Sequence, residues 1–349
     1  MTETAPLRAA IVGLGRWGQN LVLANAANPA SALRFTHAAT RSPAKVKDFC
    51  RDQGLALLPS LDEVLRSHQI EAVVLATPHS QHGAQIRRAA LAGKHVFVEK
   101  PLTLDLAEGE AALAAVHAAG VALCLGFNRR FLPAFQKLAQ VLEEGALGRP
   151  LHVEGAFSGD FGYHYTDQMW RGDERENPAG GMAAMGIHVL DAMIALLGPV
   201  RRVSAISRRA AVSAQLKDVT SVMLDFESGA TGSLSTLMAT AGFWRLHVFG
   251  SQGWAQMPDQ TSLITLDLAG RQERRAFDPS NGLARELDAF ARDARSERAY
   301  PVSHLQALQG VAAMEAIAIS AAADAEWTQV ARPATSICGA TARQPGRNH

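Results

Sequence analysis

The chain of 349 residues lacks an excess of either charge, close cysteine pairs and an N-terminal targeting pattern. Lys and Arg number 34 and Asp and Glu 33, so no surface for nucleic acid or an anionic membrane is predicted. Cys50, Cys124 and Cys338 lie too far apart for a zinc or redox dithiol site, and no metal site is predicted. The N-terminus has no basic segment before an apolar core, and no uninterrupted apolar run is long enough to span a bilayer. We therefore expect a soluble, cytoplasmic protein.

The first third of the chain alternates short apolar runs with helical segments. Buried strands are predicted at 7–12, 33–40, 71–76, 95–98 and 121–125, and helices at 16–27, 80–92 and 105–119. Connections this short predict a parallel sheet with helices on both faces. In such a sheet, ligands bind beyond the carboxyl ends of the strands.

A glycine fingerprint lies between the first strand and the first helix. It reads Gly13-Leu14-Gly15-Arg16-Trp17-Gly18, and its small residues allow the backbone to approach a pyrophosphate. The helix that follows directs its free N–H groups and positive end at the phosphates. We predict that this loop binds a dinucleotide, with Gly13, Gly15, Arg16, Trp17 and Gly18 as contacts.

The end of the second strand indicates which dinucleotide is bound. A carboxylate about 20 residues past the fingerprint would accept a hydrogen bond from the ribose 2′-hydroxyl of NAD(H). The sequence has Thr40-Arg41-Ser42 at this point, with Lys45 one helical turn further on. A guanidinium and a hydroxyl suit a 2′-phosphate, so NADP(H) is favoured over NAD(H). In the alternative reading, Arg41 and Lys45 only solvate a helix start.

Two further segments are expected at the same sheet edge. Thr77-Pro78-His79 follows the strand at 71–76, and Glu99-Lys100-Pro101 follows the strand at 95–98. A lysine near a nicotinamide can bind a substrate oxygen and favour its alkoxide form as hydride leaves or arrives. The alternative for any single lysine is an ordinary surface charge.

From about residue 127 the pattern changes to strands with few helices between them. We predict strands at 152–157, 202–207, 219–226, 230–238, 244–249 and 263–268, and helices at 133–144, 283–295 and 303–324. This suits an open, mostly antiparallel sheet. The chain therefore divides into a dinucleotide-binding domain at 1–126, a second α/β domain at 127–331 and a loose tail at 332–349.

A glycine turn at 178–181 continues into a predicted helix that ends near Leu197. His188 and Asp191 lie three residues apart and share one face of that helix. A lone histidine on an apolar helix is most often a packed residue, so this segment alone does not predict catalysis.

The combination of these motifs strongly resembles the Gfo/Idh/MocA oxidoreductases, the family of glucose-fructose oxidoreductase and inositol dehydrogenase. The resemblance covers nearly the whole chain. It is carried by the glycine fingerprint, Thr77-Pro78 with His82, the GKHVFVEKPL string at 93–102, GFNRRF at 126–131, Trp170-Arg171, and Gly180-Gly181 through Gly186, His188 and Asp191.

The resemblance implies a Rossmann domain, a second α/β domain with an open sheet, a nicotinamide cofactor, and homodimers or homotetramers formed through that sheet. It implies that Lys100 and His188 are catalytic. It also adds Thr77, Pro78, His79, His82, Glu99 and Lys100 to the cofactor contacts. Many family members have an aspartate four residues before the histidine, but this chain has Ala184 there.

We therefore predict hydride transfer between NADP(H) and a secondary alcohol or ketone of a sugar, polyol or related small molecule. Lys100 would bind the substrate oxygen, His188 would exchange its proton, and Asp191 would be a structural partner. The predicted substrate contacts are Lys100, Arg129, Tyr163, Trp170, Arg171 and His188. Two alternatives stay open: a glycosidase or lyase that cycles its cofactor without net redox change, and a cofactor-binding sensor without turnover.

Overall fold

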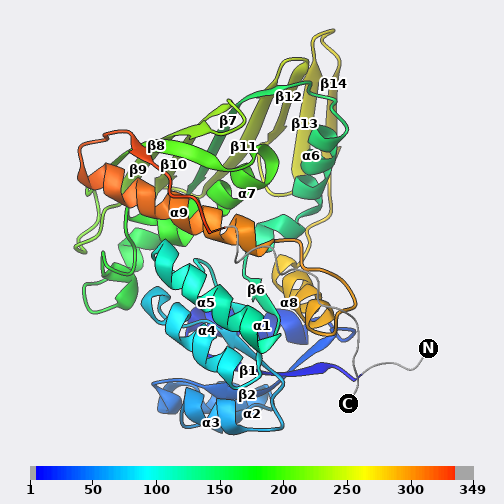
Figure 1. Ribbon diagram of the computed structural model, residues 1–349, viewed down its shortest axis with the longest axis vertical. Helices are drawn as coiled ribbons and strands as arrows, with labels where there is room; N and C mark the ends of the chain where they lie inside the picture. The colour runs from blue at the N-terminus through cyan, green and yellow to red at the C-terminus, as the bar shows by residue number, and fades with distance from the viewer. Residues whose placement is uncertain (1–4, 335–349) are drawn as a thin grey trace.

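The computed structural model describes residues 5–334 and contains two sheets with helices between and beside them (Figure 1). The first sheet and its helices are built from the first third of the chain, in blue and cyan. The second sheet comes from the green and yellow part of the chain. This confirms the predicted α/β class with two different sheets.

The first sheet has six strands in the order β3-β2-β1-β4-β5-β6, and every neighbouring pair is parallel. The strand order reverses between β1 and β4, which is where doubly wound sheets bind their ligands. The strands are β1 (Leu7–Val12), β2 (Leu33–Ala39), β3 (Ala56–Leu58), β4 (Ala72–Leu75), β5 (His95–Val98) and β6 (Leu123–Leu125).

Helices cover both faces of this sheet. Two of them begin with side-chain caps: the Ser60 hydroxyl accepts a hydrogen bond from the Glu63 N–H, and the Asp105 carboxylate accepts one from the Glu108 N–H. The helices are α1 (Arg16–Ala26), α2 (Lys47–Asp52), α3 (Leu61–Arg66), α4 (His82–Leu91) and α5 (Leu106–Ala119), with short 3₁₀ turns η1 (Pro43–Lys45) and η2 (His79–Gln81). Helix α2 and strand β3 were not predicted, because six and three residues are too short to show a hydrophobic period.

The second sheet has nine strands in the order β14-β13-β12-β11-β7-β10-β9-β8-β15. Only the β10–β7 pair is parallel, as expected for a mostly antiparallel sheet. The strands are β7 (Pro150–Ser158), β8 (Val200–Arg208), β9 (Val219–Phe226), β10 (Thr231–Leu237), β11 (Phe243–Gly250), β12 (Gly253–Met257), β13 (Ser262–Asp267), β14 (Gln272–Ala276) and β15 (Thr328–Gln329). The sequence did not predict β12, β14 or β15; β14 is polar and exposed throughout.

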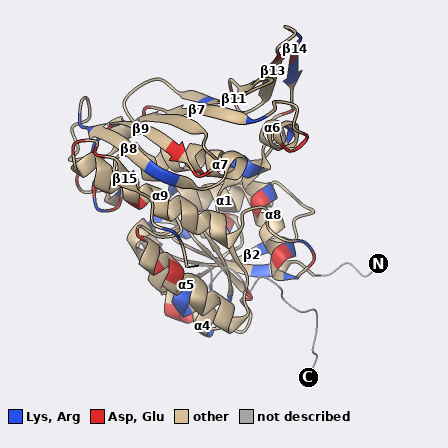
Figure 2. Cartoon of the chain, turned by 45° about the horizontal axis from the view of Figure 1, so that its top comes forward, with Lys and Arg blue, Asp and Glu red and all other residues tan. Residues whose placement is uncertain are grey.

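One face of the second sheet packs on α7 (Ile187–Leu197) and α9 (His304–Ala322), and α6 (Pro133–Glu143) packs near its β12–β13 end (Figure 1). Gly155 in β7 allows α7 to approach closely, since a Cβ there would overlap Val189 and Met193. Among the described residues no helix covers the opposite face, where Ile206, Met223 and Phe243 are exposed. Figure 2 shows only scattered charges on this sheet.

Helix α8 (Gly282–Ala294) returns from the second half of the chain to the first sheet. Leu287 and Phe290 are fully buried there, with the Phe290 ring 5.7 Å from the ring of Phe97 in β5. The core of the first sheet is therefore completed by residues more than 150 positions away along the chain.

Helix α9 is long and apolar enough, by length and composition, to cross a membrane, although the sequence predicted no uninterrupted run of that kind. Glu315 interrupts it and accepts a hydrogen bond from the Leu106 N–H of α5. The helix packs on β8, α7 and α5, and 56% of its apolar window is buried. Its hydrophobicity is thus accounted for by core packing. Of the predicted tail at 332–349, residues 335–349 lie outside the described residues.

Candidate active site

The glycine loop after β1 forms a cradle with open space in front of α1. Gly13 has φ +93°, and a Cβ there would lie 2.5 Å from the Ala76 carbonyl oxygen, so only glycine fits. Gly15 is the N-cap of α1 and has no atom within 4 Å of the position a Cβ would take. The first N–H groups of α1 therefore face unfilled space, which fits a dinucleotide pyrophosphate.

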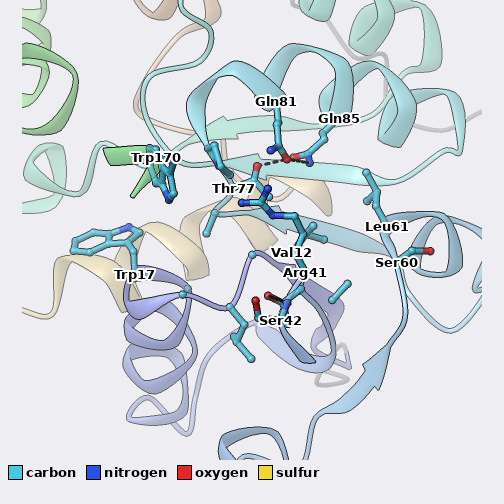
Figure 3. Close-up of a pocket in the computed structure, with 18 of the residues that line it drawn as sticks. Val12, Trp17, Arg41, Ser42, Ser60, Leu61, Thr77, Gln81, Gln85 and Trp170 are labelled. Carbon is cyan, nitrogen blue, oxygen red and sulfur yellow. Dashed lines mark hydrogen bonds between the residues drawn. The ribbon is translucent and has the colours of Figure 1, made fainter. Parts of the chain in front are cut away.

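A cleft of about 370 Å³ extends from this loop along the carboxyl edge of the first sheet (Figure 3). Its walls come from the ends of β1, β2 and β4, from the start of α4 and from a segment of the second domain. They include Gly13, Gly15, Trp17, Gly18, Thr40, Arg41, Ser42, Thr77, Pro78, Trp170 and Arg171. The cleft therefore gathers most of the residues predicted to contact the cofactor.

One end of the cleft is lined by Thr40, Arg41 and Ser42, and no Asp or Glu is among the residues that line it. Figure 3 shows the Arg41 side chain extending into the cleft. Lys45 and Arg16 were also predicted here; both are exposed, and neither lines the cleft.

His79 and His82 were predicted to contact the cofactor. Neither is among the residues that line the cleft; both are buried behind its wall. Both nitrogens of His82 lie at hydrogen-bond distance from carbonyl oxygens, that of Pro101 at 2.8 Å and that of Thr77 at 3.1 Å. Nδ1 of His79 donates to the Glu176 carbonyl at 2.6 Å, and its ring packs edge-on against Trp170. These contacts link the turn after β4 to the loop after β5 and to the second domain.

Lys100 follows β5 and is not among the residues that line the cleft, although its charge interacts with that of Arg171, which lines it; its peptide bond to Pro101 is cis. Its Nζ donates to the carbonyl oxygens of Ala184 at 2.8 Å and Ala183 at 3.3 Å. Burial lowers the pKa of Lys100 to about 8, against the opposing attraction of Glu99. The Lys100 ammonium is thus held against the second domain. Its lowered pKa allows it to exchange a proton near neutral pH.

The carbonyls that bind Lys100 belong to a π-helical turn, η6 (Met182–Gly186), which leads directly into α7. The sequence predicted a helix here, but not that its first turn is π-helical. Gly186 allows this turn, since a Cβ there would lie 2.5 Å from the sulfur of Met182. Such turns often occur at functional sites. This turn brings the start of α7 to Lys100.

His188 lies one turn beyond those carbonyls and is buried. Its Nε2 is 3.3 Å from Nη1 of Arg129, which can only donate, so Nε2 accepts and the ring proton resides on Nδ1. Within residues 5–334, Nδ1 is buried without a hydrogen-bond partner. Burial, together with the charges of Arg129 and Lys100, lowers the pKa of His188 well below its usual value. The imidazole is therefore neutral and able to accept a proton.

Asp191 lies one turn further along α7 and has a structural partner. It binds Arg130 through two hydrogen bonds, at 2.6 and 2.9 Å, and both side chains are buried. Ala184, at the position where the resemblance implies an aspartate, contributes only its carbonyl to Lys100.

Sequence reasoning missed one buried acid near this site. Glu286, on α8, is completely buried, and neither carboxyl oxygen has a hydrogen-bond partner in the described part of the chain. Burial and the nearby Glu99 raise its pKa well above the usual value. No sequence signal identified it, because α8 is amphipathic and a charged residue on it is normally exposed.

The three other predicted substrate contacts in the second domain are Trp170, Arg171 and Tyr163. Trp170 and Arg171 line the dinucleotide cleft, with the guanidinium 4.1 Å from the indole ring centre. Tyr163 is 60% exposed and donates its hydroxyl hydrogen bond to the Ala239 carbonyl. Within residues 5–334 no group of three or more His, Cys, Asp or Glu is arranged to hold a metal ion.

Two family models match the chain. One is described as an oxidoreductase family with an NAD-binding Rossmann fold and matches residues 7–127; the other is the GFO/IDH/MocA C-terminal domain and matches residues 135–256. Together they cover the first sheet and strands β7 to β11 of the second, and they include Lys100 and His188, whereas Arg129 lies between the two matched ranges.

Relatives and solved structures share this organisation. The chain is 30% identical over 240 residues to scyllo-inositol 2-dehydrogenase (NAD(+)) of Bacillus subtilis, a match that covers 65% of the chain and 66% of the relative, just under two thirds. It is 27% identical over 270 residues to trans-1,2-dihydrobenzene-1,2-diol dehydrogenase of Oryctolagus cuniculus, covering 76% and 80%. A structure of levoglucosan dehydrogenase with NADH and L-sorbose has a TM-score of 0.84 at 22% identity, covering 94% of this chain and all of that one.

Proposed function

The chain belongs to the Gfo/Idh/MocA family of oxidoreductases, and from this premise we propose that it transfers hydride between NADP(H) and a secondary alcohol or ketone of a sugar, polyol or related small molecule. One observation carries the proposal. Lys100 from the first domain is hydrogen-bonded to the turn that precedes His188 in the second domain, and it follows a strand of the sheet whose carboxyl edge holds a cleft that fits a dinucleotide. An ammonium and a neutral imidazole at that place are suited to an alcohol oxidation.

A bound nicotinamide supplies or accepts the hydride, and the protein handles the oxygen and its proton. Lys100 donates to the substrate oxygen and stabilises negative charge on it as the carbon is oxidised. His188 accepts the hydroxyl proton on Nε2, the nitrogen now facing Arg129. The substrate oxygen would replace the Ala184 carbonyl as the hydrogen-bond acceptor for Lys100. The substrate hydroxyl would also replace Arg129 as the donor to Nε2 of His188.

A preference for NADP(H) is supported by the end of the cleft lined by Thr40, Arg41 and Ser42 without an acid. The B. subtilis relative is named for NAD(+), so family membership alone does not decide between the two cofactors. We expect titration to show tighter binding of NADPH than of NADH, with the advantage reduced in Arg41→Ala. The matched control is Arg34→Ala, which removes an exposed arginine of β2 away from the cleft lining. Equal affinities in the wild type would overturn the preference.

The substrate class is tested by a screen of polyols, inositols, aldoses and their keto forms with NADP⁺ or NADPH, followed by absorbance of the reduced nicotinamide. The two relatives, an inositol and a dihydrodiol dehydrogenase, support cyclic and vicinal diols as the first compounds to test. Net formation of NADPH from an alcohol is the expected result. Product formation without net NADPH would instead favour a cofactor-cycling hydrolase or lyase, and binding without any turnover would favour a sensor.

We also propose that the protein forms homodimers or homotetramers through the uncovered face of the second sheet. Strand pairing places Ile206, Met223 and Phe243 on one face of this sheet, and they are 48%, 60% and 51% exposed. An apolar surface that no helix covers is typical of a protein interface.

A further inference from the structure

Arg129 and Arg130 are chain neighbours with opposite surroundings. Arg130 is buried and fully paired with Asp191. Arg129 has no carboxylate within 4.0 Å among residues 5–334, and its Nε is buried without a hydrogen-bond partner. A buried guanidinium without an ion-pair partner is costly, whereas one that meets a ligand carboxylate forms two parallel hydrogen bonds. Arg130 therefore has a structural role, whereas the charge of Arg129 is not matched by an ion pair within the described residues.

The Arg129 side chain is held in place at the reactive histidine. Its Nη1 donates to Oδ1 of Asn128 at 2.8 Å and meets Nε2 of His188 at 3.3 Å. The guanidinium lies over Phe157, 4.8 Å from the ring centre, and 5.8 Å from that of Trp244. Stacking on aromatic rings orients the guanidinium and leaves its edge free for hydrogen bonds.

The surrounding charges favour an anion beside Arg129. Lys100 lies nearby, and Ala184 removes the fixed carboxylate that family members commonly place at that position. Glu99 and Glu286 are buried, yet neither forms an ion pair with Arg129 within the described part of the chain. Burial raises the pKa of both carboxyls and thus favours their neutral forms.

We propose that Arg129 selects a substrate that carries a carboxylate near its reacting carbinol, that is, a hydroxy acid such as a sugar acid, with the carboxylate on Arg129 and the carbinol oxygen on Lys100 and His188. The inference rests on the proposed function and names its substrate class. The alcohol carbon loses a hydride to the nicotinamide and the oxygen loses a proton to His188, so a hydroxy acid and NADP⁺ become an oxo acid, NADPH and a proton. Pairing with the carboxylate also moves Arg129 off Nε2 of His188.

The test compares binding of acids and their uncharged counterparts to protein saturated with NADP⁺. Aldonates, uronates and short 2-hydroxy acids are each paired with the corresponding polyol, aldose or amide, and binding is followed by tryptophan fluorescence and calorimetry. We expect at least one acid to bind roughly 10- to 100-fold more tightly than its partner, the range for a hydrogen-bonded charge pair. Arg129→Met should remove that difference, and Arg129→Lys should restore part of it.

The control variant Arg274→Met removes an exposed arginine of β14 and should leave the acid preference unchanged. Thermal unfolding of Arg129→Met confirms that the variant is folded before its binding is compared. The inference is overturned if no acid binds better than its uncharged partner, or if Arg129→Met keeps the preference. Acid binding that depends on Arg129 without any hydride transfer would retain the inference and overturn the proposed function.

Discussion

At the scale of single residues, the site brings together two groups whose pKa values are shifted by burial. The pKa of Lys100 is lowered to about 8, and that of His188 is lowered well below its usual value. Alcohol oxidation needs a neutral His188 to accept a proton and a charged Lys100 to stabilise the oxygen. Both conditions hold between the two pKa values.

This ordering predicts the pH dependence of kcat/KM for alcohol oxidation. The rate should rise through an acidic limb below pH 6.5, stay level near neutrality and fall above about pH 8 as Lys100 loses its proton. In Lys100→Arg, whatever activity is left in single-turnover measurements should lose the alkaline fall, since arginine stays charged. Lys137→Arg, in α6, is the control. An unchanged alkaline limb in Lys100→Arg would show that another group titrates there.

Lys100 could be singled out from the sequence because it follows a predicted strand at the ligand edge of the sheet, whereas the catalytic role of His188 was implied only by the family resemblance. The sequence did not reveal that Lys100 binds the carbonyls of residues 183–184, because that contact joins residues 83 and 84 positions apart. Glu286 was missed for the same reason. Its burial depends on α8 crossing to the first sheet, which no local pattern encodes.

At the scale of elements, the strand–glycine turn–helix unit was predictable in detail. Strand β1, Gly13 and helix α1 each follow from local rules: an apolar run, a positive φ and a helix start. Elements without such a signal were missed. Strand β14 is an edge strand with both faces in solvent, so its residues are polar and show no alternation. The π-helical turn depends on the contact of Gly186 with Met182.

The open space at Gly15 gives a prediction that separates binding from folding. Gly15 has ordinary extended angles, φ −73° and ψ −174°, so Gly15→Ala gains about 0.4–1 kcal/mol from a less flexible unfolded chain. Because alanine is a poorer N-cap than glycine by a similar amount, the free energy of unfolding should stay within about 1 kcal/mol of the wild type. The added methyl group would occupy the space that fits the pyrophosphate, so NADPH affinity should fall at least about tenfold. Denaturant unfolding and NADPH titration measure the two effects. Gly242→Ala, also without neighbours within 4 Å, should change neither.

At the scale of the whole molecule, the two halves of the chain are joined on both sides of the cleft. Helix α8 completes the first core, and Glu176 of the second domain accepts hydrogen bonds from the N–H and hydroxyl of Ser80. The general arrangement of two sheets was predictable from the change of pattern near residue 127. The way the halves interlock was not, because these contacts are made between distant segments.

The uncovered face of the second sheet gives the prediction that belongs to the assembled molecule. Met223→Asp places a charge on a surface that we expect to be buried between copies, so the oligomer should dissociate or lose stability at low protein concentration. Leu91→Asp, on α4 and 83% exposed, should leave the assembly intact. Light scattering after gel filtration measures the mass of each variant. A wild-type monomer, or a Met223→Asp oligomer as stable as the wild type, would contradict the proposed interface.

The central claim is that Lys100 acts on the substrate of a dinucleotide-binding enzyme, and Lys100→Met tests it most directly. With a substrate from the screen, the account predicts a loss of roughly 10²- to 10⁴-fold in hydride transfer, the range for a positioned proton-transfer or charge-stabilising group. NADPH affinity, measured by fluorescence on the same preparation, should stay within about threefold of wild type, which is well under 1 kcal/mol. Lys137→Met should match the wild type in both measurements. Undiminished hydride transfer by Lys100→Met would contradict the account.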